Sequence, residues 1–138
     1  MGNIINKKEI NYNYIGNWKS NVYNNVFGKL YAYIPIYDID YSLYIKKKGK
    51  IMIKYDNYSP HKPNEKVIFD IDIFFTKNIK KNNMAKSYYI LNFSHKNNMG
   101  YEIIYNIKKF DNLDYIIGNY KSKQPFDTGL FNLNICNH

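Results

Sequence analysis

Few side chains in this sequence have the chemistry of a catalytic group. The 138 residues include three histidines and one cysteine. His61 lies in a proline-flanked loop, His95 lies in a predicted turn, and His138 is the last residue, two positions after Cys136. A Cys136/His138 pair would supply a nucleophile and a base, but no third group that would orient them can be assigned. These residues therefore do not predict an active site.

Asp70 and Asp72 are a second candidate for chemistry. They occupy alternate positions of a predicted strand, so their carboxylates would share one face, where they could bind a metal ion or act as acid and base. The other face of the strand is apolar and typical of a core: Val67, Phe69, Ile71, Ile73 and Phe75. This pattern favours an outward, solvated aspartate pair. The sequence also has no glycine-rich phosphate loop and no metal-ligand spacing, so it predicts no catalytic residue, no metal, no cofactor and no enzyme.

The composition predicts a single all-β domain. Tyrosine, isoleucine and phenylalanine, which favour strands, are abundant, whereas alanine, a leading helix former, occurs only twice. A chain of this length can bury a core without disulfides. We expect a mobile N-terminal segment over residues 1–11 and one β-barrel domain over residues 12–138.

The charge of the chain has two interpretations. The formal net charge is +9, and the sequence contains no arginine. Excess lysine would attract nucleic acid, anionic lipid or a phosphorylated ligand, but an AT-rich genome, such as that of a virus, symbiont or parasite, would also produce it. The missing arginines argue against sequence-specific DNA recognition. The single cysteine and the lack of a signal-peptide core or transmembrane segment predict an intracellular, cytoplasmic protein, or a virion component if the source is viral.

Apolar and polar residues alternate with a period of two along most of the chain, which predicts strands. The clearest predicted hairpin turns at Gly49, between two runs of alternating residues. A long antiparallel meander with one apolar face should close into a barrel of eight or nine strands; a β-sandwich is the alternative. Nine strands cannot close antiparallel throughout, so one strand would be misassigned, one would lie outside, or closure would be parallel. The predicted strands are Tyr12–Ser20, Phe27–Tyr37, Ile39–Lys47, Lys50–Tyr58, Lys66–Lys77, Ser87–Ser94, Tyr101–Lys109, Tyr115–Ser122 and Leu130–Cys136.

One phrase occurs twice, as I-G-N-W-K-S over Ile15–Ser20 and as I-G-N-Y-K-S over Ile117–Ser122. The segment Gly16-Asn17-Trp18 resembles the Gly-X-Trp opening of the calycin superfamily, which contains the lipocalins, fatty-acid-binding proteins and avidins. The segment from Gly118-Asn119-Tyr120 to Phe131 resembles a late hairpin of similar small barrels. The resemblance implies an up-and-down barrel of eight or ten strands that holds a small ligand inside.

The two phrases also predict a contact. A glycine within a strand lets the backbone coil, and the aromatic residue two positions later should cover the gap that the glycine leaves. Trp18 would thus cover Gly16, and Tyr120 would cover Gly118. If the barrel closes, the two segments should lie close together, at or beside the seam.

These observations favour a non-enzymatic barrel that binds, or binds and sequesters, a small anionic or amphipathic molecule. Lysines at predicted hairpin tips would form a basic mouth that attracts it, although solvated lysines that prevent edge pairing are the favoured explanation of these residues. The expected rim residues are Lys46, Lys47, Lys48, Lys50, Lys80, Lys81, Lys108 and Lys109. The expected interior ligand contacts are Trp18, Tyr41, Leu43, Phe69, Ile71, Phe93, Tyr105 and Ile107.

Two other classes of function remain open on the sequence. Tyr31, Tyr33 and Tyr37 share one face of a predicted strand and, with nearby lysines, could stack the bases of single-stranded nucleic acid. Outward aromatic residues such as Tyr44, Tyr88 and Tyr89 could instead form the interface of a homo-oligomer, of a viral structural protein or of a protein that blocks a host factor.

Overall fold

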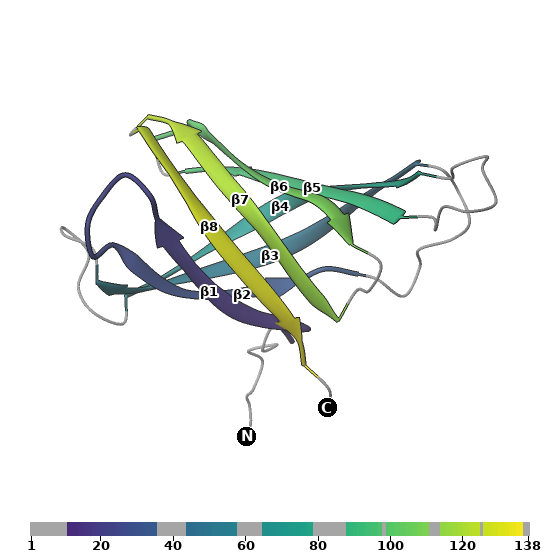
Figure 1. Ribbon diagram of the computed structural model, residues 1–138, viewed down its shortest axis with the longest axis horizontal. Coiled ribbons are helices and arrows are strands. Elements are labelled where there is room, and N and C mark those ends of the chain that lie inside the picture. Colours follow the sequence, from purple (N-terminus) through teal and green to yellow (C-terminus); the bar gives the residue numbers. More distant parts are fainter. Residues whose placement is uncertain are drawn as a thin grey trace, which may run out of the picture.

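The computed structural model describes residues 11–35, 44–57, 65–78, 88–97, 99–110, 114–124 and 126–136. These residues form eight strands and no helix (Figure 1). The strands are β1 (Tyr14–Ser20), β2 (Phe27–Tyr33), β3 (Tyr44–Asn57), β4 (Glu65–Asn78), β5 (Tyr88–Lys96), β6 (Glu102–Phe110), β7 (Tyr115–Lys123) and β8 (Phe126–Ile135).

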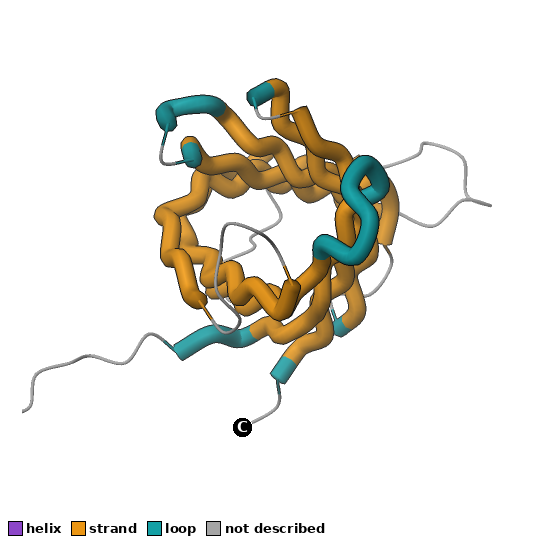
Figure 2. The backbone as a smooth tube through the Cα atoms, turned by 90° about the vertical axis from the view of Figure 1, so that its left-hand side faces the viewer, coloured by secondary structure: helices purple, strands orange, loops and turns teal. Residues whose placement is uncertain are grey.

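Each strand pairs antiparallel with the next, and β1 pairs antiparallel with β8, which closes the barrel. The view along the barrel in Figure 2 shows this closed ring. The predicted all-β antiparallel meander is therefore confirmed. We call the end where β1, β3, β5 and β7 finish the hairpin end (left in Figure 1) and the opposite one the termini end.

The predicted hairpin at Gly49 is wrong. Strand β3 runs straight through this position, where Gly49 pairs with Ile71 of β4. A Cβ at Gly49 would lie 2.3 Å from the carbonyl oxygen of Tyr33 and 2.6 Å from Cδ1 of Ile73. The glycine is therefore needed for the close approach of neighbouring chains and not for a turn. In the described part of the chain, the two segments predicted on either side of Gly49 form one strand, and the count of eight satisfies antiparallel closure.

The repeated phrases lie on β1 and β7, which flank β8 on either side, so the predicted proximity at the seam is confirmed. Their aromatic rings approach each other inside the barrel, with the centroids of Trp18 and Tyr120 6.3 Å apart. The prediction that each ring covers the glycine of its own phrase is wrong.

The rings cover glycines on neighbouring strands instead. Trp18 pairs with Gly28, and a Cβ there would lie 2.7 Å from the indole nitrogen. Tyr120 pairs with Gly129, and a Cβ there would lie 2.3 Å from its ring. Phe131 similarly occupies the space opposite Gly118. In the β1–β2 and β7–β8 pairs, each of these aromatic side chains thus faces a glycine. This pairing lets a narrow barrel enclose several aromatic rings.

Apolar side chains fill the interior of the barrel. Residues at alternate positions point inward and are almost completely buried, among them Ile34, Ile51 and Ile73, which are 0 % exposed. Burial of this apolar surface is the main source of stability in a fold of this kind.

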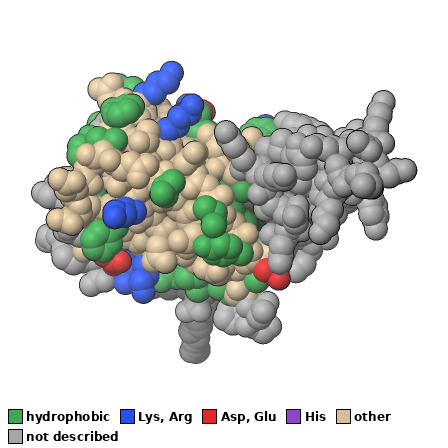
Figure 3. Space-filling view, in the orientation of Figure 1, with side chains coloured by type: hydrophobic (Ala, Val, Ile, Leu, Met, Phe, Trp, Pro, Cys, Tyr) green, Lys and Arg blue, Asp and Glu red, His purple; other side chains and the backbone are tan. Residues whose placement is uncertain are grey.

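The outer surface is not uniformly charged. The face over β7, β8 and β1 carries scattered hydrophobic side chains among polar ones (Figure 3), and the exposed ones include Ile15, Ile117 and Leu130. Lysines alternate instead along the outward face of β3: Lys46, Lys48, Lys50 and Lys54. Two of them, Lys48 and Lys50, form ion pairs with Asp72 and Asp70 of β4.

Candidate functional site

Solvent reaches inward-facing side chains at the hairpin end. Trp18 and Tyr120 are each 8 % exposed, Ser122 is 7 % and His95 is 6 %, whereas the aliphatic residues of the middle retain almost nothing. Three further inward-facing residues of this end, Tyr55, Phe69 and Asp127, are only half-buried. We call these residues together with Ser20 and Tyr105 the hairpin-end cluster.

Asp127 is the acidic centre of this cluster. Ser20 Oγ donates a hydrogen bond of 2.6 Å to Oδ1 of Asp127, and the Tyr120 hydroxyl donates one of 3.1 Å to Oδ2. Ser20 Oγ in turn accepts hydrogen bonds from the N–H groups of Val22 and Tyr23. Burial first, and the neighbouring carboxylate second, raise the pKa of Tyr120 well above its usual value, so the phenol stays a donor.

His95 forms a second polar group in the cluster, and its predicted position in a turn is wrong. The residue lies on β5 and points into the barrel, where its ring stacks on Phe69 at a centroid distance of 4.2 Å. Nδ1 lies 3.3 Å from the carbonyl oxygen of Lys96, which can only accept, so Nδ1 carries the proton. Nε2 then accepts a hydrogen bond of 2.9 Å from the Tyr105 hydroxyl.

Burial decides the protonation state of this pair. It lowers the pKa of His95 from 6.5 to about 4, against a smaller opposing effect of the Lys96 carbonyl. Burial also raises the pKa of Tyr105 far above its usual value. At neutral pH the pair is therefore an uncharged imidazole that accepts from an uncharged phenol.

Aromatic rings connect the two polar groups. The ring of Trp18 is nearly perpendicular to that of Tyr55, at 83° and 5.6 Å, and to that of Tyr120, at 79°. Tyr120 lies 6.1 Å from Tyr105. The indole N–H of Trp18 donates to the carbonyl oxygen of Lys54 at 3.4 Å, which fixes the orientation of the ring. The cluster is thus an aromatic lining with hydroxyl, imidazole and carboxylate groups at its edge.

The sequence placed many of the expected interior residues correctly on the inner face. Those inside the barrel are Trp18, Phe69, Ile71, Phe93, Tyr105 and Ile107. Tyr41 and Leu43 lie outside the described residues. The role of all eight expected interior residues as ligand contacts stays a prediction.

The sequence reasoning missed Ser20, Tyr55, His95 and Asp127. Alternation along β3 would have placed Tyr55 inside, because it shares parity with Ile51 and Ile53. Asp127 could not be placed in the same way, because it precedes the predicted start of its strand. In the structure it pairs with Ser122 at the beginning of β8.

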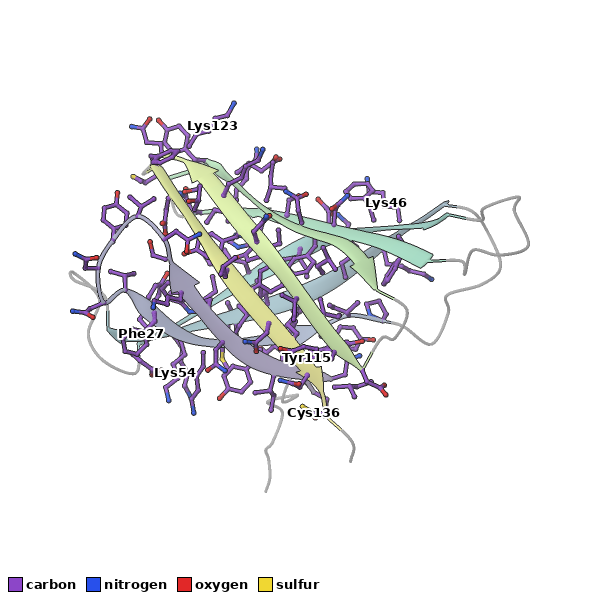
Figure 4. All side chains as sticks on the ribbon, viewed as in Figure 1. Phe27, Lys46, Lys54, Tyr115, Lys123 and Cys136 are labelled. Carbon is purple, nitrogen blue, oxygen red and sulfur yellow. The ribbon has the colours of Figure 1, made fainter. Side chains whose placement is uncertain are left out.

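The predicted basic rim is only partly described, and the part that is described does not lie on a connection. Lys46, Lys48 and Lys50 project outward from β3, and the ammonium of Lys46 lies 5.7 Å from the ring centroid of Phe74 (Figure 4). Lys47, which has the opposite parity, is half-buried. Lys80 and Lys81 lie outside the described residues, and Lys108 and Lys109 belong to the last part of β6, where side chains are not described.

The strand count also changes the end of the barrel at which the described rim lysines lie. In the resemblance to lipocalins, the mouth is the end with the first, third, fifth and seventh connections. With eight strands this is the hairpin end, whereas β6 finishes and β3 begins at the termini end. Among the described rim residues, Lys46 and Lys48 therefore lie towards the end opposite the hairpin-end cluster. The basic mouth stays a prediction.

The other candidates for chemistry do not converge. Asp70 and Asp72 face outward as predicted and form ion pairs with Lys50 and Lys48. Cys136 is half-buried beside β8, and His138 lies outside the described residues. Among the described residues, no group of three or more metal-ligating side chains comes together.

Comparison with models of protein families, with curated proteins and with solved structures finds no match for this chain. The eight-stranded closed barrel is compatible with a calycin-like fold. Within the described ranges, no helix has the length and apolar character needed to cross a membrane.

Proposed function

We propose that this barrel binds a small amphipathic molecule at the hairpin-end cluster, without catalysing a reaction. The observation that supports this most is the partial exposure of inward-facing aromatic and polar side chains at the hairpin end, next to a buried apolar core. Aromatic lining with a few convergent hydrogen-bonding groups is typical of small-molecule sites. The Gly16-Asn17-Trp18 resemblance to calycins, many of which hold ligands inside the barrel, supports the same function.

The polarity of the cluster indicates how such a molecule would be oriented. Tyr55, Phe69 and Trp18 offer apolar surface to a ring or an alkyl chain, whose burial would contribute roughly 25 cal/mol per Å². Asp127, Ser20 and Tyr120 offer hydrogen bonds to a polar group. The surface lysines would add long-range attraction if the molecule also carried negative charge.

The neutral amphipathic fluorophore N-phenyl-1-naphthylamine tests this proposal directly. Its emission rises when it leaves water, and titration into the protein should give a saturable increase with quenching of Trp18, the single tryptophan. Ser122 points into the cluster and its neighbour Lys121 points outward. Ser122→Phe should therefore abolish binding, whereas Lys121→Phe, the same added ring on the outside, should leave it unchanged.

Two results would contradict the proposal. One is the absence of saturable binding to a wild-type protein that circular dichroism shows to be folded. The other is equal binding by the two phenylalanine variants, which would place the fluorophore on the outer surface.

A row of three lysines favours single-stranded nucleic acid binding as a second candidate. Lys29 of β2 pairs directly with Lys54 of β3, which pairs directly with Lys66 of β4. Neighbouring strands are about 4.8 Å apart, so these side chains repel one another at a cost to stability. Phosphate groups would remove the repulsion. Figure 4 shows Phe27 and Lys54 projecting outward from the neighbouring strands β2 and β3.

The predicted tyrosine platform borders this row. Tyr31 and Tyr33 follow Lys29 at alternate positions of β2 and are half-buried on the outward face, whereas Tyr37 lies outside the described residues. Filter binding with labelled oligo(dT) and oligo(rU) measures affinity and its salt dependence. The triple change Lys29→Gln, Lys54→Gln and Lys66→Gln should weaken binding and lower the salt slope by about 2 to 3.

A matched control removes three outward lysines from the seam, with the changes Lys19→Gln, Lys121→Gln and Lys123→Gln. Both variants lose the same net charge, so a specific site predicts a larger loss for the first. Equal losses would mean that the three lysines are not a specific site and contribute only through the overall positive charge. No retention of oligonucleotide at low salt would exclude nucleic acid as a ligand.

A further inference from the structure

We infer that the hairpin-end cluster recognises a protonated amine, so that the ligand is an amphipathic cation. This inference rests on the proposed function and specifies the ligand class. It depends on two observations in the same cluster: a carboxylate with no lysine partner in the described part of the chain, and a tryptophan ring that stands nearly perpendicular to two tyrosine rings.

The Asp127 carboxylate has no lysine partner in the described part of the chain. The ion pairs of Lys48 with Asp72 and of Lys50 with Asp70 do not involve it. Its two hydrogen bonds come from the uncharged hydroxyls of Ser20 and Tyr120. Two carboxylate oxygens can accept about four hydrogen bonds, so Asp127 keeps acceptor capacity for a further donor. A half-buried carboxylate whose hydrogen-bond donors are neutral binds an ammonium group more strongly than it binds a neutral or an anionic group.

Tyr120 connects this carboxylate to the other aromatic rings of the cluster. Trp18 stands nearly perpendicular both to Tyr55 and to Tyr120, and the Tyr120 hydroxyl is bonded to Asp127. Faces of tryptophan and tyrosine attract a cation through the quadrupole of the ring, most strongly where water is excluded. Trp18 and Tyr120 are each 8 % exposed, so a cation that reached their rings would lose most of its contact with water.

The charge of the cluster also argues against an anionic head group at this place. His95 is the residue of the cluster that could become a cation, and burial keeps it neutral above a pKa of about 4. The lysines of neighbouring strands, Lys54 and Lys121, have the opposite parity and project outward. An anion in the cluster would therefore face Asp127 without a described cation beside it.

Three molecules with one tail and different head groups separate these possibilities: 4-phenylbutylamine, 4-phenylbutanol and 4-phenylbutyrate. Each is titrated directly into the wild-type protein at pH 7.5, with the fluorescence of Trp18 as the signal. The amine should bind about tenfold more tightly than the alcohol, and the carboxylate most weakly. The variant Asp127→Asn should bind amine and alcohol about equally, whereas Asp56→Asn, on the outward face of β3, should keep the preference.

The outcomes distinguish this inference from the proposed function. If the alcohol or the carboxylate binds as tightly as the amine, the protein binds amphiphiles but the inferred cation site is wrong. If none of the three binds, the proposed function itself fails. The wild-type series decides the matter even if Asp127→Asn does not fold. The variant Tyr55→Leu, which removes one ring wall but keeps apolar contact, should reduce the affinity for the amine more than that for the alcohol.

Discussion

The buried histidine makes the stability of the barrel depend on pH in a defined way. His95 has a pKa of about 4 in the folded protein and about 6.5 in the unfolded chain. Below pH 6.5 the unfolded chain binds a proton that the folded protein does not, so the free energy of unfolding falls until the folded protein also binds one near pH 4. The two pKa values give a total loss of about 3 kcal/mol, of which about 2 kcal/mol is reached at pH 5. Above pH 6.5 this contribution is constant.

Urea denaturation followed by Trp18 fluorescence measures this loss. The comparison is between wild type and His95→Gln, whose amide oxygen can still accept from the Tyr105 hydroxyl. Other titrating groups change both proteins alike, so the difference between them isolates His95. Between pH 8 and pH 5 the wild-type midpoint should fall about 1 M further than that of the variant, for a slope of about 2 kcal/mol per M. Parallel pH profiles would refute the assignment of a buried, neutral imidazole.

Three further predictions concern the same interior and can be checked by the same denaturation assay at pH 7.5. Tyr105→Phe leaves Nε2 of His95 without a donor and should destabilise the fold by about 1 to 3 kcal/mol; no change would mean that water replaces the phenol. Gly129→Ala places a Cβ 2.3 Å from the Tyr120 ring and from the Lys19 carbonyl oxygen, so it should cost about 1 to 3 kcal/mol and shift the near-ultraviolet circular dichroism, whereas an unchanged spectrum would contradict the ring-over-glycine packing. Phe93→Ala removes a ring that is 1 % exposed and should cost about 3 to 5 kcal/mol, with a loss below 1 kcal/mol speaking against a packed interior.

The alternation of apolar residues was sufficient to predict the barrel because burial on one face repeats every second residue. It placed Phe69 and Ile71 of β4 and Tyr105 and Ile107 of β6 inside, and Asp70 and Asp72 outside, as the structure has them. Which alternate residues of a strand point inward can be read from the sequence of that strand alone. These assignments could therefore be made without the fold.

Other features depend on neighbouring strands, and the sequence did not determine them. Glycine is typical of turns, but Gly49 lies within a strand, where the Tyr33 carbonyl oxygen approaches too closely for a Cβ. His95 precedes a run of turn residues, and the turn begins only at Asn97, whose side chain accepts from the N–H groups of Met99 and Tyr101. One misplaced turn changes the strand count, and it moves later connections to the opposite end of the barrel.

The hairpin-end cluster shows the same limit. Ser20, Tyr120 and Asp127 are distributed over most of the chain and meet only because β1, β8 and β7 adjoin at the seam. The twin phrases indicated that two of these strands would be close, and the contact of Trp18 with Tyr120 confirms it. The Asp127 carboxylate has no signature in the sequence, because its position depends on where β8 begins.

The indole resonance of Trp18 gives the most direct test of small-molecule binding at the hairpin end. The chain has one tryptophan, so a ¹H–¹⁵N correlation spectrum contains a single indole signal, from the N–H that donates to the Lys54 carbonyl oxygen. On addition of N-phenyl-1-naphthylamine we predict that this signal shifts saturably, with the same dissociation constant as the fluorescence titration. An indole signal that stays in place while amide signals of the outer strands move would contradict binding inside the barrel.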